Sequence, residues 1–168
     1  FMRGEGEPVD SVDLKEVATE VVATLETEAE KKNLEVTVEG SGTVFADQKK
    51  MFEIVTNLVS NAVNYNKQDG KVNITVAETD DEVTLKIADT GIGIEKKHIP
   101  RLCERFYRVD KSRSKKTGGT GLGLAIVKHV CAIYEAKLDI RSEYGEGTTV
   151  TVTFFKSRMP RPKPEGAE

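Results

Sequence analysis

Long apolar runs, clustered cysteines and an excess of basic residues are all missing from this sequence of 168 residues. No stretch approaches the roughly 20 apolar residues that a membrane-spanning helix requires, and no signal peptide is visible. The two cysteines, Cys103 and Cys131, lack the close spacing of a metal site, so we expect reduced thiols in a cytosolic setting. The formal net charge of −3 argues against a nucleic-acid-binding protein.

The two common nucleotide-binding fingerprints are also absent. The chain contains no GxxxxGK[ST] phosphate loop, and its glycine spacing differs from the GxGxxG of dinucleotide-binding domains. There are no internal repeats, and one domain is expected at this length.

What the sequence does contain is a segment, residues 53–66, in which asparagine recurs four times. Helical spacing places Glu53, Asn57, Asn61 and Asn64 on one face, while apolar residues cover most of the remaining surface. Asparagine is a poor helix former, and buried amides need hydrogen-bond partners. The stripe therefore predicts a face that lines a polar ligand cavity, with an internal amide network as the alternative.

The first of two glycine-rich segments follows an expected strand. Residues 82–88 alternate in polarity and are rich in β-branched side chains, which predicts a strand ending at Asp89. Gly91 and Gly93 allow backbone to approach a ligand where a Cβ would clash. The carboxylate could accept a hydrogen bond from an exocyclic amine such as that of adenine, although many ordinary turns have this composition.

The second glycine-rich segment, residues 118–124, leads into an expected amphipathic helix. Free N–H groups and the positive dipole end at such a helix start suit a phosphate, although a flexible hinge has the same composition. Residues 108–119 before it contain five cations. Between the aromatic pair Phe106 and Tyr107 and the glycines, this basic segment is better interpreted as a lid that the triphosphate orders than as a solvated loop.

These pieces, in this order, resemble the ATP-binding catalytic domain of two-component sensor histidine kinases. Residues 101–110 are similar to that family's phenylalanine box, and the resemblance runs from about residue 8 to residue 156. It implies the Bergerat-type ATP-binding fold of the wider GHKL ATPase and kinase superfamily. This fold is a two-layer α/β sandwich, in which a mixed, largely antiparallel sheet of about five strands packs on about three helices.

The resemblance implies a role for each matching residue on the phosphate side of the site. Asn61 coordinates the Mg²⁺ that bridges the ATP phosphates, and Asn57 lies near the phosphates and the incoming acceptor. Arg108 and Arg113 reach the terminal phosphates from the lid. Magnesium prefers oxygen ligands and keeps several waters, and phosphoryl transfer depends mainly on positioning and charge neutralisation.

On the adenine side, the resemblance implies that Tyr65 covers the ring and Asp89 binds its amino group. Gly91, Gly93 and Ile94 belong to that pocket. The further residues implied to bind the nucleotide are Asn64, Gly119, Thr120, Gly121, Leu122 and Gly123.

Two positions depart from the family pattern. Asn64 stands where the family commonly has lysine, so one phosphate contact is in doubt unless Lys67 replaces it. Cys103 stands where the phenylalanine box usually has phenylalanine, which affects packing under the lid more than chemistry because Phe106 remains.

Asn57 separates this chain from the gyrase-like ATPases and the anti-sigma serine kinases. Those proteins usually have glutamate at this position, where it polarises the nucleophile, whereas an amide cannot accept a proton. Slow hydrolysis and transfer to a histidine are therefore expected, and Glu53 is expected to be structural or peripheral. An anti-sigma-type serine kinase and a non-catalytic nucleotide-binding signalling module remain the alternatives.

The phosphoacceptor is expected to lie outside this chain. Neither of the two histidines, His98 and His129, has the setting that the family uses for its acceptor, and both are expected to be ordinary residues. We therefore expect residues 1–7 to be a linker or a remnant of a preceding helical domain, residues 8–156 to be the catalytic domain and residues 157–168 to be a disordered tail. The expected partners are a dimerisation and phosphoacceptor domain of the same kinase and a response regulator. The fragment itself is expected to be monomeric, and the full-length protein a membrane-anchored homodimer with this domain in the cytoplasm.

Local signals predict the order of the elements. Asp13 caps a helix that runs to about Lys32, and Asp47 caps the asparagine-rich helix. A short helix is expected over residues 97–104. The predicted strands are residues 34–38, 43–46, 71–78, 82–88, 137–142 and 148–155.

Overall fold

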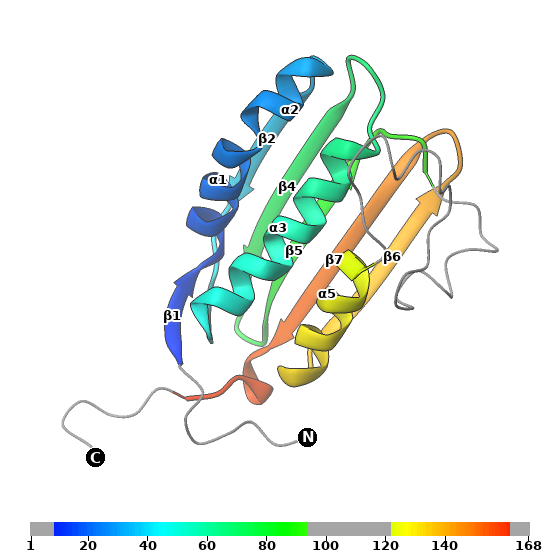
Figure 1. Cartoon of the computed structure of the whole chain (residues 1–168). Helices are drawn as coiled ribbons and strands as arrows, with labels where there is room; N and C mark the ends of the chain where they lie inside the picture. The colour runs from blue at the N-terminus through cyan, green and yellow to red at the C-terminus, as the bar shows by residue number, and fades with distance from the viewer. Residues whose placement is uncertain (1–8, 94–121, 162–168) are drawn as a thin grey trace.

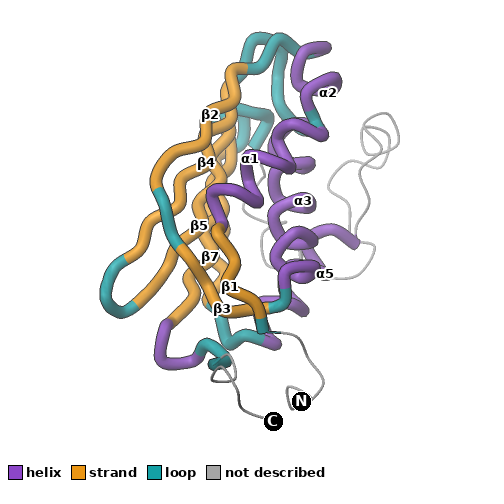
Figure 2. The backbone as a smooth tube through the Cα atoms, turned by 90° about the vertical axis from the view of Figure 1, so that its left-hand side faces the viewer, coloured by secondary structure: helices purple, strands orange, loops and turns teal. Residues whose placement is uncertain are grey.

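The computed structural model describes residues 9–93 and 122–161. The expected phenylalanine box, the lid and the helix at residues 97–104 lie outside these ranges. The described residues form two layers, with a sheet on one side and the α-helices on the other (Figures 1 and 2).

The main sheet has five strands, and the predicted mixed, largely antiparallel sheet is confirmed. Its order is β2-β4-β5-β7-β6, and the β2–β4 pair is parallel whereas the other three pairs are antiparallel. The bounds of the strands are β2 Glu35–Gly40, β4 Lys71–Glu78, β5 Glu82–Asp89, β6 Lys137–Glu143 and β7 Gly147–Phe155. Two further strands, β1 (Asp10–Asp13) and β3 (Thr43–Ala46), form a separate antiparallel pair.

Alternation along the strands separates a buried face from a solvent face. Val83, Leu85 and Ile87 of β5 are buried against the helices, and the neighbouring strands contribute inward-facing valine, isoleucine and phenylalanine. The opposite face bears Lys86 and half-buried threonines such as Thr84 and Thr151. No helix among the described residues covers this second face, so polar and β-branched side chains suit it.

The helical layer consists of α1 (Leu14–Thr24), α2 (Glu26–Lys31), α3 (Gln48–Asn64) and α5 (Leu122–Ile133). The helix α3 packs between α1 and α5 (Figure 1). Its seven buried residues are all apolar: Met51, Ile54, Val55, Leu58, Val59, Ala62 and Val63. The helix that carries the asparagines is therefore anchored in the core from Met51 to Val63.

The predicted single helix from Asp13 to Lys32 is wrong in one respect, because it is broken at Leu25. Asp13 caps α1 as predicted, since its Oδ1 accepts hydrogen bonds from the N–H groups of Lys15 and Glu16 at 3.0 and 3.1 Å. At the other end of α1, the Thr24 hydroxyl donates to the Val21 carbonyl at 2.7 Å. This side-chain bond competes with the helical ladder, and the Leu25 N–H turns back to Val22.

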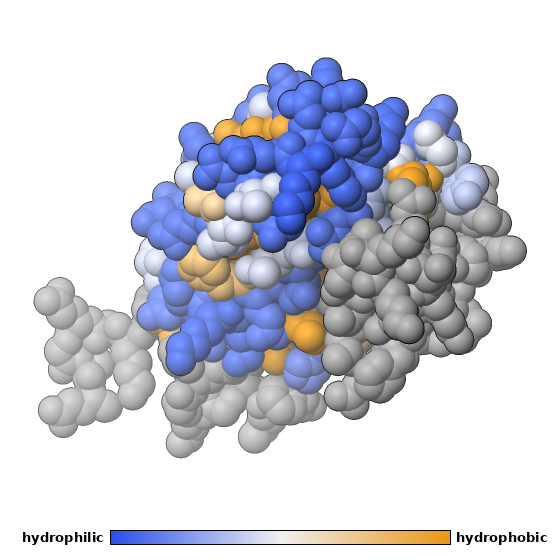
Figure 3. Space-filling model, turned by 45° about the horizontal axis from the view of Figure 1, so that its top comes forward, coloured by the Kyte–Doolittle hydropathy of each residue, from blue (hydrophilic) through white to orange (hydrophobic). Residues whose placement is uncertain are grey.

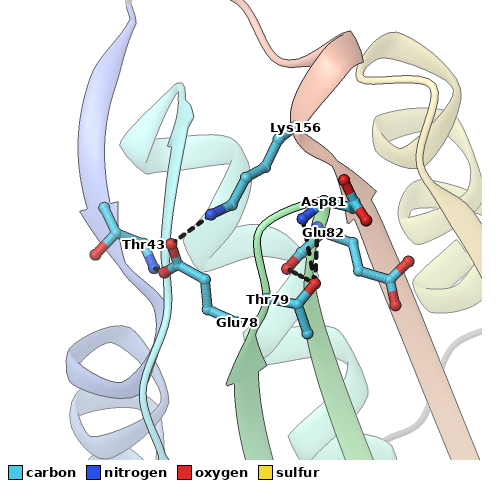
Figure 4. Close-up of polar contacts among 6 residues, drawn as sticks. All are labelled: Thr43, Glu78, Thr79, Asp81, Glu82 and Lys156. Atoms are coloured by element: carbon cyan, nitrogen blue, oxygen red, sulfur yellow. Dashed lines mark hydrogen bonds and ion pairs between the residues drawn. The ribbon is translucent and has the colours of Figure 1, made fainter.

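The folded domain also extends past the predicted boundary at residue 156. A short 3₁₀ helix, η2 (Lys156–Arg158), follows β7, and Met159 packs against the core. The Lys156 N–H donates to the Asp81 carbonyl at 2.9 Å, and its ammonium contacts Glu78 at 2.8 Å. Figure 4 shows Glu78 between this ammonium and the Thr43 N–H, which donates to Glu78 at 2.9 Å. These contacts explain why residues 157–159 are ordered rather than part of a disordered tail.

Replacing Lys156 by methionine should lower the free energy of unfolding by about 0.5 kcal/mol at pH 7, since the ion pair is partly exposed. The hydrogen bond from Lys156, with that from Thr43, holds the pKa of Glu78 below its ordinary value of 4.5. A lowered carboxylate pKa stabilises the fold above pH 4.5, and this contribution is lost as the pH falls through the folded-state pKa. Urea unfolding should therefore show a smaller effect at pH 3 than at pH 7. The exposed Lys137, replaced by methionine, is the control, and an equal loss of stability in both variants would contradict the prediction.

Candidate nucleotide-binding site

The asparagine stripe lies at the boundary of the buried face of α3. Asn57, Asn61 and Asn64 are each half-buried, whereas Glu53 is exposed. The predicted apolar positions are buried, but the amide face is more open to solvent than expected for a fully buried helix. An open face is required if these amides are to meet a ligand.

The alternative of an internal amide network is not what the described residues form. The Asn57 Nδ2 donates to the Glu53 carbonyl at 2.7 Å, and the Asn64 Nδ2 donates to the Ser60 hydroxyl at 3.1 Å. The Asn61 amide makes no hydrogen bond within the described part of the chain. The stripe thus consists of two amides held against their own helix, with an amide available for a ligand between them.

Asp89 ends strand β5 and, by alternation with the buried Ile87, faces the helical layer. Its Oδ1 accepts hydrogen bonds from the Gly91 N–H at 2.8 Å and the Thr148 N–H at 3.3 Å. Its Oδ2 has no hydrogen-bond donor among the described residues. Burial raises the pKa of Asp89 from 3.8 to about 6, and the two amide hydrogen bonds oppose that rise. A held carboxylate with one oxygen left to accept suits an amine-bearing ligand.

The loop from Asp89 to Gly93 is fixed from three directions. Thr90 exchanges two hydrogen bonds with Lys71, at 3.2 and 2.8 Å. The Ile92 N–H donates to the Tyr65 carbonyl at 3.2 Å, at the end of α3. On the other side, the Ile92 carbonyl accepts the Gly145 N–H of the β6–β7 turn at 2.6 Å. The predicted Asp-x-Gly-x-Gly segment is therefore held between the end of α3 and the β6–β7 turn.

Both predicted glycines of this loop lack room for a side chain. A Cβ on Gly91 would lie 2.5 Å from the Tyr65 carbonyl oxygen. Gly93 has a φ of +72°, and a Cβ there would overlap the Glu143 carbonyl. Backbone of the loop thus packs directly on the residue that follows α3, which brings Tyr65 and Asp89 into one site.

Sequence reasoning missed Asn66, which organises the floor of this site. Asn66 is 2% exposed, its Nδ2 donates to the Lys71 carbonyl at 3.0 Å, and its Oδ1 accepts from Lys67 and Thr90. The residue continues the asparagine run but lies beyond the helix end, so the helical stripe did not include it. The signal available was its position directly after the expected adenine-side tyrosine.

The proposed replacement of the missing family lysine by Lys67 finds no support in its contacts. The Lys67 side chain is exposed, and its backbone N–H donates to Asn66. A different cation, Lys32, lies at the end of α3 instead, where its ammonium donates to the Asn64 carbonyl at 2.6 Å. No sequence signal pointed to Lys32, because its partners are more than 30 residues away.

Several predicted site residues lie outside the described residues: Ile94, Arg108, Arg113, Gly119, Thr120 and Gly121. Leu122 and Gly123 form the first turn of α5, which begins earlier than the predicted residue 125, and their side chains are not described. Within α5, Val127, Val130 and Cys131 are buried, whereas His129 is exposed as expected for an ordinary residue. The described part of the site is therefore its α3 and β5 side.

A groove elsewhere in the molecule does not contribute to this site. It has a volume of about 270 Å³ and lies where α1, α2 and β2 meet α3, lined by residues such as Val22, Leu25, Leu34 and Val63. Seen from the end that carries α2, the described surface is mostly hydrophilic, and hydrophobic residues form only small separate areas (Figure 3). The groove includes none of the asparagine stripe or the Asp89 loop.

Comparison with known proteins assigns the chain to a family. Residues 46–158, from the strand before α3 to η2, match the family described as histidine kinase-, DNA gyrase B-, and HSP90-like ATPase. The chain belongs to this ATPase family. The matched residues include α3, the Asp89 loop and α5, so the site described above lies within the part of the chain that matches the family.

Curated relatives of the ATPase domain are sensor histidine kinases, as the sequence predicted. The chain is 50% identical over 104 residues to the phosphate regulon sensor protein PhoR of Pseudomonas aeruginosa, covering 62% of the chain and 24% of that protein. It is 37% identical over 147 residues to the sensor-like histidine kinase SenX3 of Mycolicibacterium smegmatis, covering 86% and 38%. The chain thus spans well under half the length of these relatives.

Solved structures confirm the predicted fold. The mycobacterial sensor histidine kinase MprB is 27% identical with a TM-score of 0.70, covering 88% of this chain and 97% of that one. Full-length ShkA in complex with AMPPNP is 27% identical with a TM-score of 0.74, covering 88% of this chain and 31% of that one. No helix among residues 9–93 and 122–161 is long and apolar enough to cross a membrane.

Proposed function

We propose that this ATPase domain is the catalytic part of a two-component sensor histidine kinase. It binds ATP with Mg²⁺ and donates the γ-phosphoryl group to a histidine on a separate dimerisation and phosphoacceptor domain. Two observations carry the proposal. Among residues 9–93 and 122–161, the Asn61 side-chain amide on α3 and the Asp89 Oδ2 have no hydrogen-bond partner, and the loop after Asp89 contacts Tyr65.

On the adenine side, Asp89 is proposed to accept a hydrogen bond from the exocyclic amine. Tyr65 is proposed to cover the ring, and Gly91 and Gly93 are proposed to shape the pocket by letting the loop pack closely on the backbone of Tyr65 and Glu143. At neutral pH the carboxylate is ionised, because its pKa is about 6, so it accepts a charge-assisted hydrogen bond.

Asn61 is the proposed protein ligand of Mg²⁺. An amide oxygen is a suitable donor, since Mg²⁺ takes oxygen ligands and commonly uses one or two protein groups together with substrate phosphates and waters. The described residues contain no cluster of three acidic, histidine or cysteine side chains that could hold an ion without the nucleotide. This donor set fits a metal that arrives with the triphosphate, and Mg²⁺ then supplies neutralisation of the phosphate charge.

Asn57 is proposed to favour transfer over hydrolysis. Its amide cannot remove a proton from water, and its Nδ2 is held on the Glu53 carbonyl. A neutral imidazole nitrogen needs no such base, so it attacks the γ-phosphorus directly, the bond to the bridging oxygen breaks and ADP leaves. Arg108 and Arg113 are proposed to contact the terminal phosphates, and Asn64, Ile94, Gly119, Thr120, Gly121, Leu122 and Gly123 to complete the nucleotide contacts.

The remaining parts of the system are also proposals. The chain spans only 24% and 38% of the two relatives above. Since these relatives are sensor proteins, we propose that the full-length protein is a membrane-anchored homodimer with a phosphoacceptor domain, and that it acts on a response regulator. The fragment itself is proposed to be monomeric and to lie in the cytoplasm.

The proposal is tested by mixing the chain with a purified phosphoacceptor domain and ATP labelled on its γ-phosphate. We expect label on histidine, stable in base and labile in acid. Label on serine would indicate an anti-sigma-type kinase instead. ATP bound without any transfer would indicate a non-catalytic signalling module.

A further inference from the structure

The end of helix α3 is held by a cation from another part of the chain. The Lys32 ammonium, just after α2, donates to the carbonyls of Val63, Asn64 and Asn66 at 3.1, 2.6 and 3.2 Å. The last turn of α3 contains no basic residue of its own. Carbonyls at a helix C-terminus lack intrahelical partners and carry the negative end of the dipole, so an ammonium with three donors suits them.

The backbone next to Lys32 joins the same region. The Lys32 carbonyl accepts the Asp69 N–H at 2.8 Å, and the Asn33 side chain donates to the Asp69 carboxylate at 2.7 Å. The Glu35 N–H then donates to the Gly70 carbonyl at 3.0 Å. The segment after α2 therefore forms hydrogen bonds along the turn between α3 and β4, in addition to those from the Lys32 ammonium.

The residues that Lys32 holds are those on which the Asp89 loop rests. Tyr65 lies between the bonded carbonyls of Asn64 and Asn66, and its own carbonyl accepts the Ile92 N–H at 3.2 Å. Asn66 contacts Thr90 through its Oδ1 at 3.4 Å. A shift of this backbone would move Tyr65 and the loop together, while Asn61, one turn earlier, would stay on the helix.

We propose that Lys32 is a positioning residue for the nucleotide, acting through the backbone of residues 63–66 and never touching the ligand. The inference rests on the proposed function. The Lys32 ammonium fixes the position of Tyr65 and the Asp89 loop relative to Asn61. The site can then bind the adenine base and the metal-bound phosphates simultaneously. Asn64 supplies no positive charge at this helix end, but the Lys32 ammonium does, and it is bound to the backbone carbonyls.

The test compares Mg–ATP affinity, by titration calorimetry, in the 168-residue chain and its variants. Lys32→Met should weaken binding about tenfold, because three charge-assisted hydrogen bonds are lost at the supporting backbone. Lys32→Arg, which keeps the charge and can bond two carbonyls, should restore affinity to within about threefold. Lys31→Met, at the exposed neighbouring lysine, makes the same change of charge and should leave affinity within about twofold.

Hydrogen exchange of the nucleotide-free protein gives the second readout. In Lys32→Met, exchange should rise at the amides of Tyr65, Asn66 and Ile92 and stay unchanged at the distant strand β1. Val12→Ala, a core change in β1, provides a variant of lowered stability with the site intact. It should bind Mg–ATP as the wild type does at a temperature where both are folded.

Three results would overturn the inference. Wild-type affinity in a folded Lys32→Met variant would make the lysine merely structural, and so would an equal loss of affinity in Val12→Ala. Failure of Lys32→Arg to recover any affinity would exclude a role for the charge. If the wild type itself binds no Mg–ATP, the proposed function fails together with this inference, and that outcome is separate from the others.

Discussion

Asn61→Ala is expected to weaken Mg–ATP binding about 100-fold, equivalent to about 2.7 kcal/mol. The substitution removes the amide that the described residues leave without a partner, and with it the proposed protein ligand of the metal. Alanine is a better helix former than asparagine by roughly 0.5 kcal/mol, so α3 should be no less stable. A loss of binding would therefore not reflect unfolding.

The decisive measurement compares ATP affinity with Mg²⁺ and with a chelator. In the wild type, Mg²⁺ should strengthen binding, whereas in Asn61→Ala that gain should disappear and the metal-free affinity should remain. Thr56→Ala, at an exposed position of the same helix, is the matched control. A variant that keeps its full magnesium dependence would assign the metal to other residues.

Asp89→Asn is expected to weaken ATP binding about 10- to 100-fold, the range for a lost hydrogen bond to a charged group. The new amide can keep the Gly91 and Thr148 hydrogen bonds through its oxygen, and it then presents an N–H group where Oδ2 was. A donor there faces the donor of the adenine amine. Inosine triphosphate, which has an acceptor oxygen in that position, should lose less affinity or gain some.

The same substitution should change stability with pH in a defined direction. The folded state binds more protons than the unfolded state between pH 3.8 and about 6, so the stability of the wild type falls as the pH rises through this window. Above it, the buried carboxylate destabilises the fold by up to about 3 kcal/mol, from a pKa difference of about two units. Asp89→Asn removes this cost and should be more stable than the wild type at pH 7.5, with little difference below pH 4.

Urea unfolding at these two pH values tests the stability of Asp89→Asn, and competition with labelled nucleotide tests its specificity. If Asp89→Asn is less stable than the wild type at pH 7.5, burial of the ionised carboxylate does not destabilise the fold. Equal ATP affinity in wild type and variant would remove Asp89 from the adenine site. In the wild type, ATP affinity should also fall as the pH drops below about 6, because a protonated Asp89 is a weaker acceptor.

The sequence predicted most of this fold because its local signals agree with one another. The β4 strand begins and ends as alternation predicted, and Asp13 and Asp47 cap the two helices assigned to them. The break at Leu25 was not predictable, since it depends on where the Thr24 hydroxyl finds a carbonyl. Hydropathy also could not show that Met159 packs back on the core.

For the site, sequence reasoning located the residues that are proposed to contact the ligand better than the residues that support them. Asn61 and Asp89 stood out because an amide in a helix and a carboxylate before glycines are locally unusual. Lys32 and Asn66 are locally ordinary, and their importance arises from carbonyls and loops that are distant in sequence or beyond a helix end. Support of this kind depends on tertiary contacts, which a motif does not contain.

The uncovered face of the sheet has a practical consequence for experiments on this domain. Lys86, Thr84 and Thr151 point away from the layer that carries Asn61 and toward which Asp89 faces. A fluorophore or a surface tether attached at this exterior would leave nucleotide entry unobstructed. At Thr84 or Lys86 it would also sit on β5, within a few residues of Asp89, the carboxylate proposed to bind the base.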